Sequence, residues 1–165
     1  GSKLNCYIRL AAETLDDNVC DKIQKLNVTL PDEQQVNSPE ELQQLQIYKE
    51  QMLSEYEDSC RLSVIYQSNS SNSRACKSIA TPRIQSSCYS FTAAQSETPS
   101  LCLKAAKLMG PERISQGGGS NVFHECFATI AVKKKDIQMC STILQYVDAE
   151  YLQLFCPDCS QPSKC

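Results

Sequence analysis

Apolar residues in this chain recur at helical spacing around four pairs of cysteines. After the first cysteine of each pair, apolar or small residues stand four and five positions later, as Leu10 and Ala11 follow Cys6. The fourth position is one helical turn away, so it shares a helix face with the cysteine. Most first cysteines are also followed directly by an aromatic residue: Tyr7, Tyr89 and Phe127, with Arg61 as the exception. The pattern predicts a helix around each first cysteine.

The second cysteine of each pair is predicted to lie near the start of another helix. Four residues before it stands a side chain of the class that caps helix N-termini: Asp16, Asn72, Thr98 or Asp136. Apolar residues flank it at helical spacing. Short connections between helices give antiparallel neighbours. The sequence therefore predicts four helix–turn–helix repeats, near residues 6–23, 60–79, 88–105 and 126–143.

Each repeat is expected to be closed by its own disulfide. With a rise of ~1.5 Å per residue, the two cysteines of a repeat stand at similar heights above the turn. This geometry allows a bridge inside each repeat, contributing about 3 kcal/mol, and we expect none between repeats. The predicted pairs are Cys6–Cys20, Cys60–Cys76, Cys88–Cys102 and Cys126–Cys140.

A long helix is predicted between the first two repeats. Ser38 and Glu41 have the spacing of a capping box, and proline stands at the first helical position. Apolar residues then keep helical spacing toward Cys60, which predicts one helix over Pro39–Tyr66. The loop Leu26–Asn37 leads into it.

The overall fold class is predicted as all-α. No alternating apolar run bounded by turn residues predicts a strand. Gly117–Ser120 is expected to form a flexible link; whether it and Gly1–Ser2 are native is open. We expect an array of four disulfide-linked antiparallel helical hairpins, solenoid-like or a compact bundle, over residues 1–155. A cysteine-rich tail follows at 156–165.

Composition indicates the compartment. Eleven cysteines in 165 residues, mostly far apart, favour disulfides in an oxidising compartment over a metal cluster. We therefore expect an extracellular, periplasmic or cell-surface location. A net charge of -3 argues against a nucleic-acid partner. No apolar run approaches the roughly 20 residues needed to span a membrane.

The repeated residues resemble a loosely described repeat of exported archaeal and bacterial proteins of unknown role. That pattern runs cysteine, aromatic, three residues, alanine, then a second cysteine some fourteen residues on, followed by isoleucine. The residues that carry the resemblance are Cys6, Tyr7, Ala11, Cys20 and Ile23, then Cys88, Tyr89, Ala93 and Cys102, then Cys126, Phe127, Ala131, Cys140 and Ile143. The second repeat departs at the aromatic and the alanine. The resemblance implies extracytoplasmic helical hairpins and supplies no catalytic residue.

Three cysteines of the tail, Cys156, Cys159 and Cys165, lie outside the repeats. One interpretation is a fifth bridge with one thiol left over, which could join two chains. A second is a zinc site with His124, although one Cys-x-x-Cys without a partner pair is a weak signal. A third is thiol–disulfide exchange, but the motif follows a helix instead of beginning one. His124 itself is expected at the surface or in a capping role.

The sequence assigns no catalytic residue and no cofactor. Asn27 and Asn69 match the N-glycosylation pattern in predicted loops. Because repeat arrays use extended surfaces to bind macromolecules, we expect a non-enzymatic secreted or cell-envelope protein that acts through protein–protein contacts, as part of a surface assembly or a homo-oligomer. The alternatives are a small extracytoplasmic enzyme or ligand carrier, and a metal or redox role for the tail.

Overall fold

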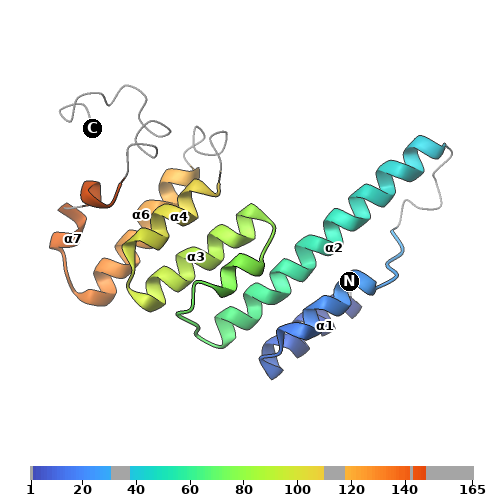
Figure 1. The fold of residues 1–165 in the computed structure, drawn as a ribbon, viewed down its shortest axis with the longest axis horizontal. Coiled ribbons are helices and arrows are strands. Elements are labelled where there is room, and N and C mark those ends of the chain that lie inside the picture. Colours follow the sequence, from blue (N-terminus) through green and yellow to red (C-terminus); the bar gives the residue numbers. More distant parts are fainter. Residues whose placement is uncertain (1, 31–37, 110–117, 142, 148–165) are drawn as a thin grey trace. The chain divides into compact units, whose positions relative to one another are not determined.

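The computed structural model describes residues 2–30, 38–109, 118–141 and 143–147. Over these ranges all regular structure is helical and no strand is present, which confirms the all-α prediction. In chain order, with η for a 3₁₀-helix, the elements are α1 Ser2–Thr14, η1 Asp17–Lys25, α2 Pro39–Gln67, η3 Ala75–Ser78, α3 Pro82–Ser96, α4 Pro99–Lys107, α6 Gly118–Lys134, α7 Gln138–Ser141 and η4 Ile143–Tyr146 (Figure 1).

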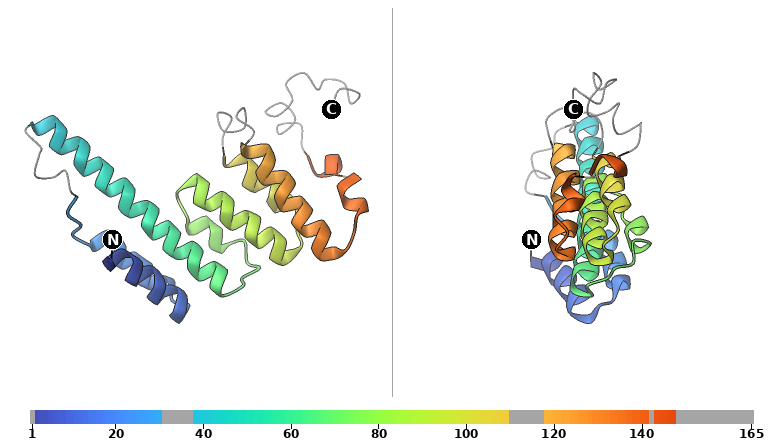
Figure 2. Two further views of the ribbon diagram at one scale, coloured as in Figure 1. Left: turned by 180° about the vertical axis from the view of Figure 1, so that it is seen from behind. Right: turned by 90° about the vertical axis from the view of Figure 1, so that its left-hand side faces the viewer.

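The chain forms two compact units. The first comprises Gly1–Ser68 and Ile79–Ile84, and the second comprises Asn69–Ser78 and Gln85–Cys165. In the first unit α1 and η1 pack against α2, and in the second α4 lies beside α6 (Figure 2). The predicted boundary between a repeat domain and a tail at residue 155 lies outside the described ranges.

The long helix α2 confirms its prediction at both ends. It runs over Pro39–Gln67, one residue beyond the expected Tyr66. The Ser38 hydroxyl accepts a hydrogen bond from the Glu41 amide, and the Glu41 carboxylate accepts one from the Ser38 amide, both at 3.2 Å. This reciprocal capping box satisfies two of the N–H groups that a helix start leaves unpaired. The sequence alone thus fixes where α2 begins.

The turn that ends the first helix has the same backbone in three of the repeats. The residue after the helix has a φ of 55°, 53° and 55°, in the left-handed region, at Leu15, Glu97 and Lys135. The next amide donates to the carbonyl of a buried alanine five residues earlier, in the pairs Asp16–Ala11, Thr98–Ala93 and Asp136–Ala131. This Schellman arrangement satisfies carbonyls at the helix end. The alanine of the repeat therefore marks the last turn of the first helix.

The predicted caps before the second cysteines form in three repeats. A side-chain oxygen accepts a hydrogen bond from the amide two residues later at Asp16, Asn72 and Asp136, at 3.0, 3.1 and 3.0 Å. Thr98 makes no such bond, and its hydroxyl instead donates to the Ser96 carbonyl. The capping signal therefore locates the second arm of each repeat, although one of the four side chains does not act as a cap.

The disulfides run between repeats, so the predicted pairing within repeats is wrong. The bridges are Cys20–Cys60, Cys76–Cys88 and Cys102–Cys126, with Cα–Cα distances of 5.7, 5.6 and 5.6 Å. None of the expected pairs Cys6–Cys20, Cys60–Cys76, Cys88–Cys102 or Cys126–Cys140 forms. In every bridge the second cysteine of one repeat joins the first cysteine of the next. Cys6 and Cys140 are left exposed and free at the two ends of this register.

The reason for the shifted pairing is the direction in which the side chains point. Each residue advances a helix by about 100°, so the first cysteine and the alanine five residues later point about 140° apart. The alanine lies at the turn into the repeat's own second arm, and the cysteine therefore points away from that arm. The predicted pairing rests on height above the turn, and height does not determine direction.

The second arms differ from one another in helix type and length. In repeats 1 and 2 they are the 3₁₀-helices η1 and η3, and in repeat 4 the arm is α7, which has 4 residues. Only repeat 3 has a longer α-helix here, α4 with 9 residues. What the structure shows is an all-α protein in which three disulfides link helices. The array of four hairpins stays a prediction.

The predicted flexible link is wrong for Gly118–Ser120, which form the first turn of α6. The first N–H groups of any helix have no intrahelical partner, so glycine costs less there than in a helix interior. The remainder of α6 is anchored by the buried side chains of Phe123, Cys126 and Phe127. Gly117 lies outside the described ranges.

Candidate functional site

Two of the three junctions between bridged repeats are small apolar cores built around buried sulfurs. At the junction of repeats 3 and 4, the earlier repeat contributes Ala93, Cys102 and Ala106, and the later one contributes Phe123, Cys126, Phe127 and Ile130. At the junction of repeats 1 and 2 the corresponding residues are Ala11, Cys20 and Ile23 against Leu53, Cys60 and Val64. The alanine face and second cysteine of one repeat are thus covered by the next repeat's first helix.

The same face is open after repeat 4. Cys140 corresponds in the repeat to Cys102 but is exposed, whereas Ala131, which corresponds to Ala93, is buried. A groove of about 360 Å³ lies here, which we call the end groove; it is lined by Ala128, Ala131, Val132, Lys135, Asp136, Ile137 and Cys140. Val132 is 77% exposed and Ile137 is 86% exposed. Large apolar side chains left this accessible mark a surface suited to binding another segment.

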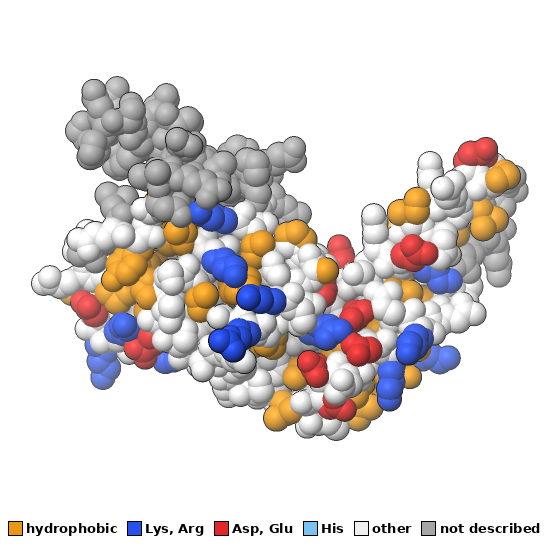
Figure 3. Space-filling model, viewed as in Figure 1, with side chains coloured by type: hydrophobic (Ala, Val, Ile, Leu, Met, Phe, Trp, Pro, Cys, Tyr) orange, Lys and Arg blue, Asp and Glu red, His pale blue; other side chains and the backbone are white. Residues whose placement is uncertain are grey.

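A second exposed apolar surface lies on residues 39–49 of α2, which we call the α2 arm. None of its residues is buried, and the first buried residue of the helix is Leu53. Figures 1 and 2 show that this part of α2 extends beyond α1. Leu42 and Tyr48 are 61% and 58% exposed, and Figure 3 shows hydrophobic side chains at the surface of this part of the helix.

The apolar residues of the α2 arm form a stripe. Leu42, Leu45 and Tyr48 are spaced three residues apart, and Met52 continues the line into the core of the first unit. This spacing places them on one helix face. The face of α2 that packs in the core from Leu53 onward is therefore continued by the arm, where Leu45 is half-buried and Leu42 and Tyr48 are exposed.

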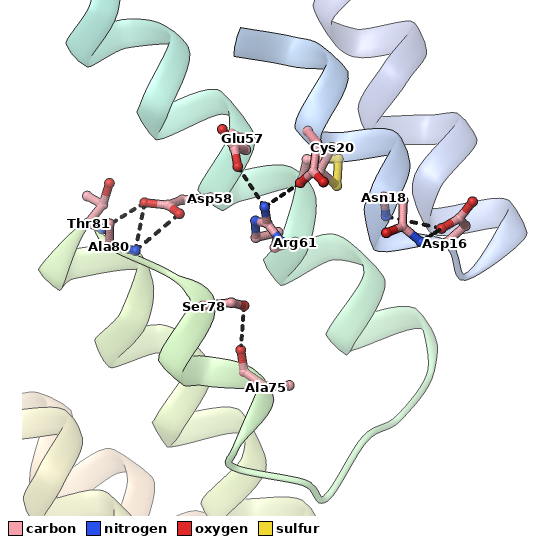
Figure 4. A network of polar contacts seen from close by, with 12 residues as sticks. Asp16, Asn18, Cys20, Glu57, Asp58, Arg61, Ala75, Ser78, Ala80 and Thr81 are labelled. Carbon is pink, nitrogen blue, oxygen red and sulfur yellow. Dashed lines mark hydrogen bonds and ion pairs between the residues drawn. A yellow bond between two sulfur atoms is a disulfide. The ribbon is translucent and has the colours of Figure 1, made fainter.

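Arg61 is the centre of a charged cluster beside the Cys20–Cys60 bridge. Its guanidinium donates to Asp21 at 2.5 Å and to Glu57 at 2.7 Å (Figure 4). Burial alone would lower the pKa of Arg61, but the hydrogen bond and charge of Glu57, with the charges of Asp21 and Asp17, outweigh it and raise that pKa. The cluster holds η1 to α2, so its role is structural.

Asp58 is a buried carboxylate that positions the start of α3. It is 4% exposed, and its oxygens accept hydrogen bonds from the amides of Ala80 at 3.2 Å and Thr81 at 2.7 Å (Figure 4). These amides precede Pro82, so the carboxylate satisfies N–H groups at the helix entry and offsets its own desolvation. All its described partners are backbone groups, which is typical of a cap and not of a catalytic acid.

The predicted metal ligands are not brought together by the described part of the chain. His124 is exposed on α6, with its ring 5.8 Å from that of Phe123, as expected for a surface histidine. Cys156, Cys159 and Cys165 lie outside the described ranges. Within those ranges no group of three or more His, Cys, Asp or Glu side chains has the geometry to hold a metal ion. The zinc, redox and fifth-bridge interpretations of the tail stay predictions.

Both predicted glycosylation acceptors have the accessibility that modification needs. Asn27 is exposed in the irregular segment after η1, and Asn69 is exposed in the turn after α2. Their placement in loops is confirmed. Whether they carry sugar stays a prediction.

Sequence reasoning missed the end groove and the role of Asp58. The groove had a signal in the repeat itself, because the second cysteine of a repeat is left exposed where no further first helix covers it. Asp58 had none, since a carboxylate three residues after Glu55 in an acidic helix segment looks like a solvated face.

Comparisons with protein-family models, curated proteins and solved structures give no match. Among the helices described, none is long and apolar enough to cross a membrane. Three disulfides in one chain indicate an oxidising, extracytoplasmic compartment. Both basic and acidic side chains occur on the face seen in Figure 3, so neither sign of charge covers it.

Proposed function

We propose that this protein is a non-enzymatic module of the cell exterior that acts by binding another protein through the α2 arm. The proposal includes the localisation expected from the sequence, secreted or in the cell envelope, and the array of repeats as its scaffold. The observation that carries it is the apolar stripe of Leu42, Leu45 and Tyr48 on a helix segment in which no residue is buried.

The stripe has the spacing by which an amphipathic helix is recognised in a hydrophobic groove. Its first turn is fixed by the capping box at Ser38, so the arm does not depend on a partner to define where the helix begins. Below the arm, the same helix is held by the Cys20–Cys60 bridge and the core around Leu53. A preorganised helix loses less conformational entropy on binding than a disordered segment does. These features support a rigid helix presenting an apolar face to a partner groove.

The test uses site-specific photocrosslinking of the intact protein in extracts of its native source. A benzophenone amino acid replaces Tyr48 in one variant and Gln43, which is exposed and points about 140° away from Tyr48 on the helix, in the matched control. We expect an adduct of one defined mass from position 48 and none from position 43. The variant Leu42→Asp, which places a charge on the stripe, should remove the adduct.

Affinity for the crosslinked protein then measures the contribution of the stripe. We expect Tyr48→Ala to weaken binding about 30-fold, which corresponds to about 2 kcal/mol for a central aromatic contact. The control Gln43→Ala should change affinity less than about twofold. Equal adducts from both positions, or no adduct from position 48, would contradict a binding role for the α2 arm.

A further inference from the structure

We propose that the end groove binds the chain's own C-terminal segment, residues 148–156, and that Cys140 forms a fourth disulfide with Cys156. The segment thereby takes the place that the first helix of the next repeat takes at the other junctions. This inference is independent of the function proposed for the α2 arm.

The pattern of the three bridges predicts that Cys140 bonds to a cysteine further along the chain. Cys20, Cys76 and Cys102 are the second cysteines of their repeats, and each is bonded to the next cysteine of the chain that follows its repeat. Cys140 is the second cysteine of repeat 4 and is free in the described structure. The next cysteine along the chain is Cys156. Their sequence separation is 16 residues, which falls between the separations of 12 and 40 in the existing bridges.

The end groove supplies the apolar surface that the other junctions use. At the junction of repeats 3 and 4, Ala93 and Cys102 are fully buried by the helix that follows. At the end groove, the corresponding Cys140 is exposed and Val132 and Ile137 are the most exposed large apolar residues of the chain's described part. Covering them with apolar side chains removes that area from water, at about 25 cal/mol per Å².

The sequence before Cys156 fits this surface. Four residues before each bridged first cysteine stands an apolar residue, Tyr56, Ile84 or Val122, and Leu152 stands four residues before Cys156. Val147, the last described residue, packs against the cluster that contains Ala131 and Met139. The segment therefore starts from the apolar core to which Ala131, one of the residues that line the end groove, also belongs.

Cys156 suits the position better than Cys159. The residues two positions before the bridged first cysteines Cys60, Cys88 and Cys126 all lie inside helices. The corresponding residue for Cys159 is Pro157, and proline breaks a helix interior. For Cys156 it is Leu154, which a helix accepts, and Pro157 would end such a helix directly after Cys156, earlier than the helices that contain Cys60, Cys88 and Cys126 end.

The bond forms by thiol–disulfide exchange with an oxidised dithiol or other disulfide of the same compartment. The thiolate of Cys140 attacks that disulfide, forms a mixed disulfide and releases one thiolate of the oxidant. The thiolate of Cys156 then attacks the Cys140 sulfur and releases the second. The two protons lost by the cysteines and the two electrons leave on the oxidant, which ends as two thiols.

The test is alkylation of the intact oxidised protein without reduction, followed by peptide mapping. We expect the Cys140 and Cys156 peptides to be linked in the wild type, with Cys140 unlabelled. In Cys156→Ser the Cys140 peptide should become labelled, whereas the matched control Cys165→Ser should leave it unlabelled. After mild reduction, Leu152→Asp should slow reoxidation of the pair at least fivefold, because the apolar segment no longer favours the groove.

Each other outcome overturns the proposal. A free Cys140 in the wild type would show that the groove is open. Linkage of Cys140 to Cys159 or Cys165 would show that the register of the repeats does not continue into the tail. A Cys140–Cys6 link in dimers resolved on a non-reducing gel would show that a second copy of the chain occupies the groove.

Discussion

Two junctions have the same pattern of disulfide pairing but differ in the residue that directly follows the first cysteine. In repeat 4 it is Phe127, which is 1% exposed and lies 5.2 Å from the ring of Tyr146 and 5.8 Å from that of Phe123. In repeat 2 it is Arg61, whose guanidinium binds Asp21 across the junction and Glu57 on its own helix. Both junctions have a disulfide and the same kind of turn, but the residue next to the first cysteine is aromatic at one junction and charged at the other.

The difference teaches that the repeat specifies a geometry and leaves the packing chemistry free. The Cys102–Cys126 junction excludes water with aromatic rings, and the Cys20–Cys60 junction is held at its edge by charges. Dispersion and apolar burial do not depend on salt at ordinary concentrations, whereas ion pairs with partly exposed partners are screened. The two junctions should therefore respond to different perturbations.

The largest effect is expected from truncating the aromatic side. Phe127→Ala removes a fully buried ring and leaves a cavity among Phe123, Ile130 and Tyr146. The free energy of unfolding should fall by about 4 kcal/mol, measured by urea denaturation followed by circular dichroism. Phe127→Leu, which keeps much of the volume, should cost less than about 1.5 kcal/mol. If both variants cost the same, cavity formation would not be the reason for the loss.

A smaller effect is expected from the charged side. Arg61→Met keeps most of the side-chain volume and leaves Glu57 without its cation, which should cost about 1–2 kcal/mol. Raising the salt concentration to about 1 M should reduce this cost, chiefly through the Asp21 pair, because Asp21 is 54% exposed and Glu57 only 19%. The cost of Phe127→Ala should stay unchanged. A cost for Arg61→Met that is independent of salt would show that its packing, and not its charge, matters.

Salt and not pH is the informative variable for Arg61. Its pKa is raised, so the stability that its charge contributes is present at every pH below the ordinary arginine pKa and is lost only as pH rises through the folded value. Over the pH range in which proteins are normally studied, the arginine stays charged.

The features that the sequence predicted correctly are local ones. Local signals worked: the capping box at Ser38 gave the start of α2, and Asp16, Asn72 and Asp136 act as caps where their spacing put them. These features depend on residues a few positions apart, and their physics is contained in a short segment.

The pairing of the cysteines could not be obtained the same way. Cys20 lies 40 residues from Cys60, and which of two candidate partners it meets depends on where α2 packs, a tertiary choice. The end groove required the same knowledge, because it exists only where a following helix is missing. The stripe on the α2 arm was visible at Leu42, Leu45 and Tyr48, but its exposure was not, since the same spacing also describes a buried helix.

The smallest effect is expected at the residue with a left-handed backbone that follows the first helix of a repeat. Leu15 and Lys135 both have a φ of 55°, where a side chain costs conformational energy that glycine does not. Leu15→Gly and Lys135→Gly should therefore each stabilise the protein by about 0.5–1 kcal/mol, offset in part by the greater freedom of glycine in the unfolded chain. The matched control Glu125→Gly, at an exposed position inside α6, should destabilise it by about 1 kcal/mol. Equal gains at both turns, one beside the arginine junction and one beyond the aromatic one, would show that the turn is set by the backbone alone. Unequal gains would mean that the neighbouring packing chemistry reaches the turn, and that the repeat specifies less geometry than its shared φ values indicate.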